Sequence, residues 1–210
     1  MQTKAHIRYK TASGKRVPGA TTITGLRAKP FLISWANRLG LEGIDSTKFR
    51  DKMADVGTCT HYMVQCDLDG TTPDLDDYSP NQLKLAETAF SKYLDWKVNQ
   101  DLEVIKLEVP LVSEQYHYGG TLDVYCRLNG VLTLLDLKTS KAIYDDYGFQ
   151  LAAYKQLLEE HGHQVDDARI LRIGRAENEG FEDKPFGRLK LHWEVFKRLL
   201  EIYYLEKKLK

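Results

Sequence analysis

The sequence predicts a single α/β domain in which a central mixed β-sheet is flanked by helices. Its 210 residues are enough to bury one core, and one domain is the default at that length. Helical and strand-like segments follow in the order helix, three strands, helix, strand, helix, which is typical of a sheet covered by helices. Asn129-Gly130 joins two strand-like runs, and this pair suits the positive φ angles of a type I′ hairpin.

Residues 1–100 are expected to form an N-terminal hairpin followed by helices. The segment from Ile7 through the turn-forming Ala12–Lys15 indicates the hairpin. Pro30–Leu39 has helical spacing and is followed by Gly40, a helix stop.

A second helix is expected around Gly57–Val64, before the acidic segment Asp67–Pro80. That segment contains Pro and Gly and has no hydrophobic period, so we expect a surface loop. A long helix then begins with Ser79 as its N-cap and runs to about Val98.

Residues 101–175 are expected to form the core and residues 176–210 a C-terminal helix. The hydrophobic pattern predicts three strands, a helix, a fourth strand and the terminal helix. Their expected ranges are Leu102–Val112, Tyr118–Leu128, Val131–Thr139, Asp145–His161, Ala168–Ile173 and His192–Lys210.

The Asn129-Gly130 turn sets the register of two strands and brings two carboxylates together. If Leu128 pairs with Val131, counting back places Asp123 directly opposite Asp136. Side-chain alternation puts Lys138 on the face of Asp136. The apolar face is expected to hold Leu122, Val124, Leu135 and Leu137.

Two facing carboxylates repel each other, so a cation is expected between them. Hard oxygen ligands at this spacing suit Mg²⁺ or Mn²⁺, as one ion or two, and disfavour soft metals. The alternative is a surface salt bridge of Lys138 with one aspartate. Cys59, Cys66 and Cys126 match neither a zinc site nor a disulfide framework, and we interpret them as free thiols.

The formal net charge is zero, but the charges are unevenly distributed. Positions 1–41 contain no Asp or Glu, whereas eight Lys and Arg residues lie there. This asymmetry favours a basic face that binds a polyanion. A solvated basic surface without a ligand is the alternative.

Several short motifs together resemble the nuclease core of RecB-type exonucleases in the PD-(D/E)XK superfamily. Each motif is weak alone, and their order and spacing carry the resemblance. It spans Val17 to Tyr154, and the upstream motifs resemble phage-encoded members and the mitochondrial genome maintenance exonucleases. The motifs are Val17–Thr24, Trp35-Ala36, Gly57-Thr58-x-x-His61, Glu108-x-Pro110, Gly120-x-x-Asp123, Asp136-x-Lys138-Thr139 and Gln150-x-x-x-Tyr154.

The resemblance implies a restriction-endonuclease-like core and a Mg²⁺- or Mn²⁺-dependent DNA exonuclease. It implies that His61, Asp123 and Asp136 bind metal, and that Lys138 orients the attacking water or stabilises charge. Glu108 would support the metal site, while Gln150 and Tyr154 would fix Lys138 and contact the substrate. Asp136 stands where many relatives have Glu, and the absent cysteine quartet implies no iron–sulfur cluster.

DNA is the expected partner, with a preference for single strands that have free ends. Trp35 and Tyr62 would stack on unpaired bases, and Lys15, Arg16 and Arg38 would contact phosphates. The alternative interpretation of Trp35 is a core residue. A sequence-specific endonuclease of the same fold and a catalytically silent DNA-binding subunit are the alternatives.

No apolar stretch of membrane-spanning length and no secretory signal are apparent, so a cytoplasmic protein is expected. The resemblance favours a role in recombination, repair or phage DNA processing, in a bacterium or a phage-infected host cell. A recombination protein or a single-strand-binding protein is a further expected partner.

Overall fold

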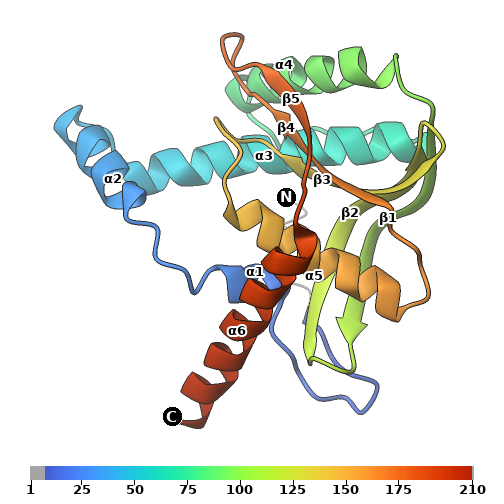
Figure 1. Ribbon diagram of the computed structural model, residues 1–210. Helices are drawn as coiled ribbons and strands as arrows, with labels where there is room; N and C mark the ends of the chain where they lie inside the picture. Colours follow the sequence, from blue (N-terminus) through green and yellow to red (C-terminus); the bar gives the residue numbers. More distant parts are fainter. Residues whose placement is uncertain (1–7, 210) are drawn as a thin grey trace.

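The computed structural model describes residues 8–209, which form a five-stranded mixed sheet flanked by helices (Figure 1). The α/β class and the central mixed sheet predicted from the sequence are confirmed. The helices are α1 Ala20–Thr24, α2 Phe31–Leu41, α3 Ser46–Asp69, α4 Pro80–Lys97, α5 Asp146–Glu160 and α6 Leu189–Lys208. The strands are β1 Leu102–Ser113, β2 Tyr118–Leu128, β3 Val131–Lys138, β4 Asp167–Ile173 and β5 Phe181–Pro185.

The strands lie in the order β1-β2-β3-β4-β5, and β3 is the central strand. The β1–β2, β2–β3 and β4–β5 pairs are antiparallel, whereas β3 and β4 are parallel. The α5 crossover joins the parallel pair, as a parallel connection requires. Asn129 and Gly130 have φ angles of 50° and 84° and Leu128 pairs with Val131, so the predicted hairpin and its register are confirmed.

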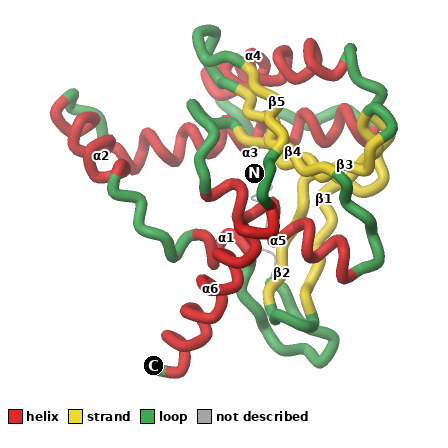
Figure 2. Tube along the Cα trace, viewed as in Figure 1, coloured by secondary structure: helices red, strands yellow, loops and turns green. Residues whose placement is uncertain are grey.

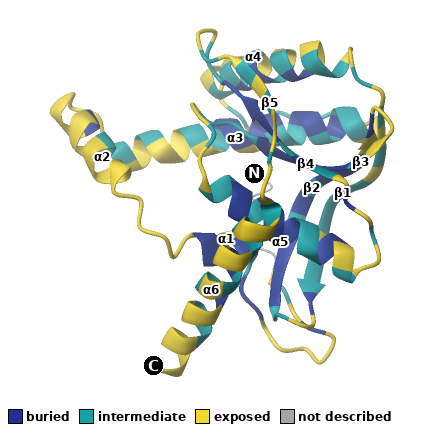
Figure 3. Cartoon of the chain, viewed as in Figure 1, coloured by how far each residue is buried: buried dark blue, intermediate teal, exposed yellow. Residues whose placement is uncertain are grey.

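Helices lie on both sides of the sheet (Figure 2), and each face of the sheet carries its own hydrophobic cluster. One cluster joins α3 and α4 to the sheet and includes Val64, Tyr93 and Leu135. The other lies under α5, α1 and α6 and includes Leu151 and Phe196. Figure 3 shows α2 and the C-terminal part of α6 largely exposed. Within residues 8–209, no helix is long and apolar enough to cross a membrane.

Helix α3 is much longer than the predicted Gly57–Val64. It begins after Asp45, whose carboxylate accepts the N–H groups of Thr47 and Lys48 and so caps the helix. It ends at Gly70, which has a left-handed φ of 71°, so the predicted loop begins there rather than at Asp67.

Two elements were not anticipated, and the start of the terminal helix also differs. Helix α1 is a single short turn, and β5 is a polar strand whose sequence lacks an apolar alternation. Ion pairs join β5 to β4, including Arg169 with Asp183 at 2.7 Å. Helix α6 begins at Leu189 instead of His192.

The N-terminal hairpin is confirmed within the described residues. The Val17 N–H donates to the Tyr9 carbonyl at 3.1 Å, and Gly14 has a φ of 82° in the turn. The Tyr9 hydroxyl lies 2.9 Å from Thr121 Oγ1 on β2, so the hairpin packs on the sheet. Ile7 lies outside the described residues.

The β1–β2 ribbon exchanges its two faces half-way along. Leu122 belongs to the cluster under α5, whereas Val124 belongs to the cluster under α3 and α4. The same exchange separates Leu107 from Val109 on β1. Glu108 between them has a φ of 48°, which breaks the alternation of a regular strand. The expectation that Leu122 and Val124 share a face is therefore wrong.

Candidate active site

Asp136, at the centre of the sheet, is the most deeply buried Asp or Glu side chain among residues 8–209. Strand β3 holds it between β2 and β4, and its side chain is 1% exposed. Burial raises the pKa of this carboxyl to about 7; Lys138 opposes the shift, and Asp123 adds to it. Among the described residues, neither carboxylate oxygen accepts a hydrogen bond of normal geometry. Such a group in a native fold calls for a partner that is an ion or water.

Asp123 lies near Asp136, just beyond the last observed β2–β3 pair. The pairing runs from Leu128↔Val131 to Val124↔Leu135, and the charge of Asp123 acts on the Asp136 carboxyl. The Asp123 Oδ2 atom accepts the Leu137 N–H at 2.7 Å. This bond draws the Asp123 carboxylate toward the segment between Asp136 and Lys138 and leaves its other oxygen for a ligand.

Lys138 completes the group. Its ammonium forms an ion pair with Asp136 Oδ2 and lies 5.2 Å from the centroid of the Tyr147 ring. Burial alone would lower the pKa of Lys138, but Asp136 and Asp123 outweigh it and raise the pKa above its usual value. Lys138 is 18% exposed, so it is a cation here and not the surface residue of a solvated salt bridge.

Glu108 occupies the position on β1 beside Asp123. It lies between the pairs Leu107↔Val124 and Val109↔Leu122, where its left-handed backbone breaks the strand. Unusual backbone angles at non-glycine residues gather at functional sites. The structure therefore brings Glu108 to the edge of the carboxylate pair.

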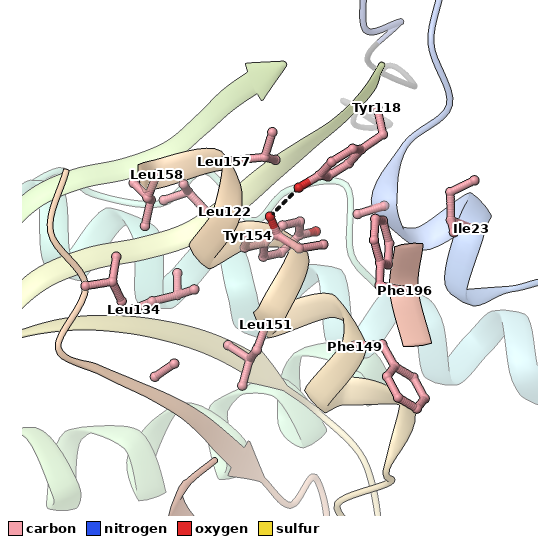
Figure 4. Packing of buried hydrophobic residues seen from close by; sticks show 14 of the residues in the cluster. Ile23, Tyr118, Leu122, Leu134, Phe149, Leu151, Tyr154, Leu157, Leu158 and Phe196 are labelled. Atoms are coloured by element: carbon pink, nitrogen blue, oxygen red, sulfur yellow. Dashed lines mark hydrogen bonds between the residues drawn. The ribbon is translucent and has the colours of Figure 1, made fainter. Parts of the chain in front are cut away.

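Gln150 and Tyr154 lie one turn apart on α5 and are hydrogen-bonded to each other. Gln150 Nε2 donates to the Tyr154 hydroxyl at 2.8 Å. Burial, and then the charges of Asp136 and Asp123, raise the pKa of Tyr154 well above its usual value. Figure 4 shows Tyr154 beside Leu122 in the buried cluster. Tyr154 thus belongs both to the core and to the surroundings of the carboxylates.

Gly120 makes room for the Tyr154 ring. A Cβ atom at this position would lie 2.5 Å from Tyr154 Cε1. The glycine before Asp123 is therefore required by the close approach of β2 to α5.

His61 lies on α3 and lines an open cleft of about 1100 Å³. One turn earlier, α3 approaches the end of β3 closely, because a Cβ at Gly57 would lie 2.5 Å from Thr139 Oγ1. In the described part of the chain, no three His, Cys, Asp or Glu side chains are grouped so as to hold a metal ion. His61 as a third metal ligand stays a prediction.

The carboxylate pair fits a hard divalent cation. Asp136 and Asp123 offer oxygen atoms, and within residues 8–209 Asp136 Oδ1 has no hydrogen-bond partner, while Oδ2 pairs with Lys138. Mg²⁺ and Mn²⁺ are commonly held by one or two carboxylates, with water and substrate phosphates completing the shell. A cluster of three protein ligands is therefore not needed for this class of site.

The cleft beside Lys138 is both cationic and aromatic. It runs between α2, α3 and the segment that joins β3 to α5, and none of its lining residues is Asp or Glu. Its cationic side chains are Lys29, Arg38, Arg50, Lys141 and Arg175. Its aromatic side chains are Phe31, Trp35, Phe49, Tyr144 and Tyr147.

Two of the five residues predicted to bind DNA line this cleft. They are Trp35 and Arg38. Trp35 is half-buried, and its ring centroid lies 6.3 Å from that of Phe49. Tyr62 instead accepts the backbone N–H of Asp74 and faces the loop after α3. Lys15 and Arg16 are exposed on the N-terminal hairpin and do not line the cleft.

The sequence contained a signal for the lining residues that were missed. Lys141, Tyr144 and Tyr147 follow the Asp136-x-Lys138 motif within one short segment. Arg175 follows β4, and the carboxyl ends of parallel strands lie at the same edge of a sheet. Arg175 also donates to the Met53 carbonyl on α3 at 3.2 Å, which fixes it across the cleft.

Comparison with known proteins gives structural neighbours but no family. No family model matches the chain, and no curated protein matches it significantly. A candidate exonuclease from Eubacterium rectale has a TM-score of 0.48 and 14% identity, covering 72% of this chain and 67% of that one. An alkaline exonuclease from Laribacter hongkongensis has a TM-score of 0.36 and 13% identity, covering 75% and 90%. The chemistry of this site is therefore inferred from its own residues.

Proposed function

We propose that the protein is a Mg²⁺- or Mn²⁺-dependent deoxyribonuclease that hydrolyses phosphodiester bonds. The observation that carries the proposal is Asp136, a buried carboxylate that lies near Asp123, pairs with Lys138 through Oδ2 and has no hydrogen-bond partner at Oδ1 among residues 8–209. A fold retains such a group when a ligand completes it. The two carboxylates and the ammonium form the charge pattern that a metal-dependent phosphodiesterase requires.

One or two bound cations, held by Asp123 and Asp136, would polarise the phosphate and lower the pKa of a bound water. Lys138 lies two residues after Asp136 on β3, and its ammonium contacts the Asp136 carboxylate. Its ammonium can donate a hydrogen bond to the attacking water or stabilise negative charge on the phosphate. Its pKa is raised, so it acts as a donor and a charge rather than as a base.

The other residues orient this group. Asp123 is fixed by the Leu137 N–H, and Gln150 fixes the Tyr154 hydroxyl. Glu108 flanks Asp123 on the neighbouring strand. Rigid hydrogen-bonded neighbours hold reacting groups in position and so contribute to the rate.

We further propose an exonuclease that prefers single-stranded DNA with free ends. Support comes from the cleft next to Lys138, which offers aromatic rings to unpaired bases and cations to phosphates. Such an activity would serve recombination, repair or phage DNA processing in a bacterial or phage-infected cytoplasm. A recombination or single-strand-binding protein would then be a suitable partner.

Two alternatives predict different products. A sequence-specific endonuclease of the same fold would cut a circular strand or duplex at defined sites. A silent DNA-binding subunit would bind DNA without cutting it, although Asp123, Asp136 and Lys138 are all present.

The test compares a linear single strand, the same strand circularised and a blunt duplex, each with Mg²⁺, Mn²⁺ or EDTA. We expect rapid loss of the linear strand with either metal and none in EDTA. Asp123→Asn and Lys138→Met should lower the rate at least a hundredfold, as loss of a catalytic charge does. Asp95→Asn, an exposed change on α4, is the matched control. Full activity in Asp123→Asn would contradict the assigned site.

A further inference from the structure

The cleft is bridged on its outer side by two contacts between distant parts of the chain. The rings of Phe31 and Tyr144 stack with their centroids 5.5 Å apart and their planes 5° apart. Beside them, Lys29 Nζ lies 2.6 Å from Asp146 Oδ2. Both contacts join the start of α2 to the segment around the start of α5. We name these four residues the clasp.

The clasp closes a ring of chain around the cleft. Residues 42–45 connect α2 to α3 covalently, and α3 meets Thr139 at Gly57. From Thr139 the chain continues to Tyr144 and so returns to the clasp. Figure 1 shows α2, α3 and the β3–α5 segment as separate stretches of chain, and the stacked rings of Phe31 and Tyr144 join the first of them to the last. All these sides contribute lining residues.

The clasp is the weak side of the ring. Phe31 is 51% exposed and Tyr144 is 37% exposed. Of the ion pair, the Lys29 side chain is 38% exposed and Asp146 is 16% exposed, so water screens the pair from the lysine side. The remaining sides are a covalent turn and a close helix–strand contact that lies against the core. The ring can therefore open at the clasp while the fold is retained.

We propose that the clasp makes the cleft a passage that a single polynucleotide strand enters by its end. This inference rests on the proposed function and deepens it. With the clasp closed, a strand that has an end can thread past the aromatic rings and cationic side chains to Lys138. A circular strand has no end and is admitted when the clasp opens. The clasp, rather than the chemistry at Asp136, determines the requirement for ends.

The experiment measures binding without cleavage. Linear and circular versions of one fluorescent single strand are titrated in EDTA against the chain carrying Asp136→Asn. The closed clasp should give fast binding of the linear strand and slow binding of the circle. Adding Lys29→Ala and Tyr144→Ala removes one stack and one surface ion pair, and circle binding should become about tenfold faster relative to the linear strand.

A matched variant and a covalent lock complete the design. Ile33→Ala lies on the same helix, is 75% exposed and does not line the cleft, so the ratio should not change. Phe31→Cys with Tyr144→Cys, joined by a short bismaleimide, should bind the linear strand and exclude the circle. The three native cysteines are buried and should not react.

The outcomes separate this proposal from the proposed function. Equal binding of circle and linear strand by the Asp136→Asn chain would overturn the clasp, as would a lock that excludes both strands. Neither result depends on cleavage. Absence of metal-dependent cleavage in the unmodified chain would overturn the proposed nuclease activity. The ratio of circle binding to linear-strand binding would still test the clasp separately. Melting curves of each variant check that the fold is intact.

Discussion

At the scale of single residues, the surroundings of Asp136 disfavour its ionised form. It is buried at the centre of the sheet, and the nearby Lys138 does not compensate for the lost hydration, since the pKa still rises to about 7. Raising the pKa from the usual 3.8 to about 7 corresponds to at most about 4 kcal/mol of unfavourable free energy for the ionised form. The fold tolerates this at a position where a cation can bind.

The free energy of unfolding should therefore depend on pH through Asp136. The folded chain keeps this proton to a higher pH than the unfolded chain, so the stability from this residue falls as pH rises between about 4 and 7. Asp136→Asn mimics the protonated form and should abolish this fall. In EDTA at pH 8 its melting temperature should equal or exceed that of the unmodified chain. Thermal melts across pH check this.

Mg²⁺ supplies the control for that experiment. The ion binds the ionised carboxylate, so the stabilisation by Mg²⁺ should be larger at pH 8 than at pH 5.5 and should be absent in Asp136→Asn. Asp95→Asn should follow the unmodified chain at every pH. A stability difference between the unmodified chain and Asp136→Asn that does not change with pH would contradict the assigned pKa.

The carboxylate pair could be predicted from the sequence because it depends on a local turn. Asn129-Gly130 fixes a two-residue hairpin, and register then follows by counting. The position of Leu122 could not be predicted in this way. Its face depends on the left-handed backbone at Glu108, on a different strand, and side-chain alternation alone does not reveal such a break.

At the scale of elements, the contact between α3 and Thr139 positions the cleft next to the end of β3, the strand that carries Asp136 and Lys138. Gly57→Ala would place a Cβ atom 2.5 Å from Thr139 Oγ1. We expect a loss of about 1–3 kcal/mol in the free energy of unfolding, the usual effect of overpacking, and a lower cleavage rate. Adding Thr139→Ala removes the oxygen and should restore much of the stability. Denaturant unfolding of the two single variants and the double variant measures this coupling.

Gly40→Ala is the matched helical control. No atom lies within 4 Å of a Cβ at that position, so replacing the glycine inside α2 should stabilise the chain by about 0.5–1 kcal/mol. A destabilisation by Gly57→Ala that Thr139→Ala leaves unchanged would mean that the close approach is not what limits this position.

Elements with strong local signals could be predicted, and those stabilised by tertiary contacts could not. Helix α4 begins at Pro80 as expected, where the Ser79 N–H donates to Gln82 Oε1 at 2.9 Å. Strand β5 has a polar sequence and depends on pairing with β4 and on its ion pairs. The first half of α3 is largely exposed, so hydrophobic periodicity could not extend the predicted helix back to Ser46.

At the scale of the whole molecule, the positive charge of the N-terminal region is divided between two surfaces. Arg38 and Lys29 line the cleft with Lys141 and Arg175 from the C-terminal half. Lys15 and Arg16 lie on the hairpin, which packs on the far part of the β1–β2 ribbon through Tyr9 and Thr121. The net charge of zero conceals this arrangement, because the acidic residues lie outside the cleft lining.

The two surfaces should differ in how they depend on strand length. Each phosphate contact to a single strand contributes about 0.7 to the slope of log affinity against log salt. Arg38→Ala with Lys141→Ala should therefore reduce the slope by about 1.4 for short and long oligonucleotides alike, because both occupy the cleft. Lys15→Ala with Arg16→Ala should reduce it for the long strand alone, which extends beyond the cleft to the hairpin. Fluorescence anisotropy in EDTA at several salt concentrations measures the slope for each strand length with both variants and with the unmodified chain. If the variant with Lys15→Ala and Arg16→Ala has the same long-strand slope as the unmodified chain, Lys15 and Arg16 are solvated charges. If the variant with Arg38→Ala and Lys141→Ala has the same slopes as the unmodified chain, the strand does not pass through the cleft.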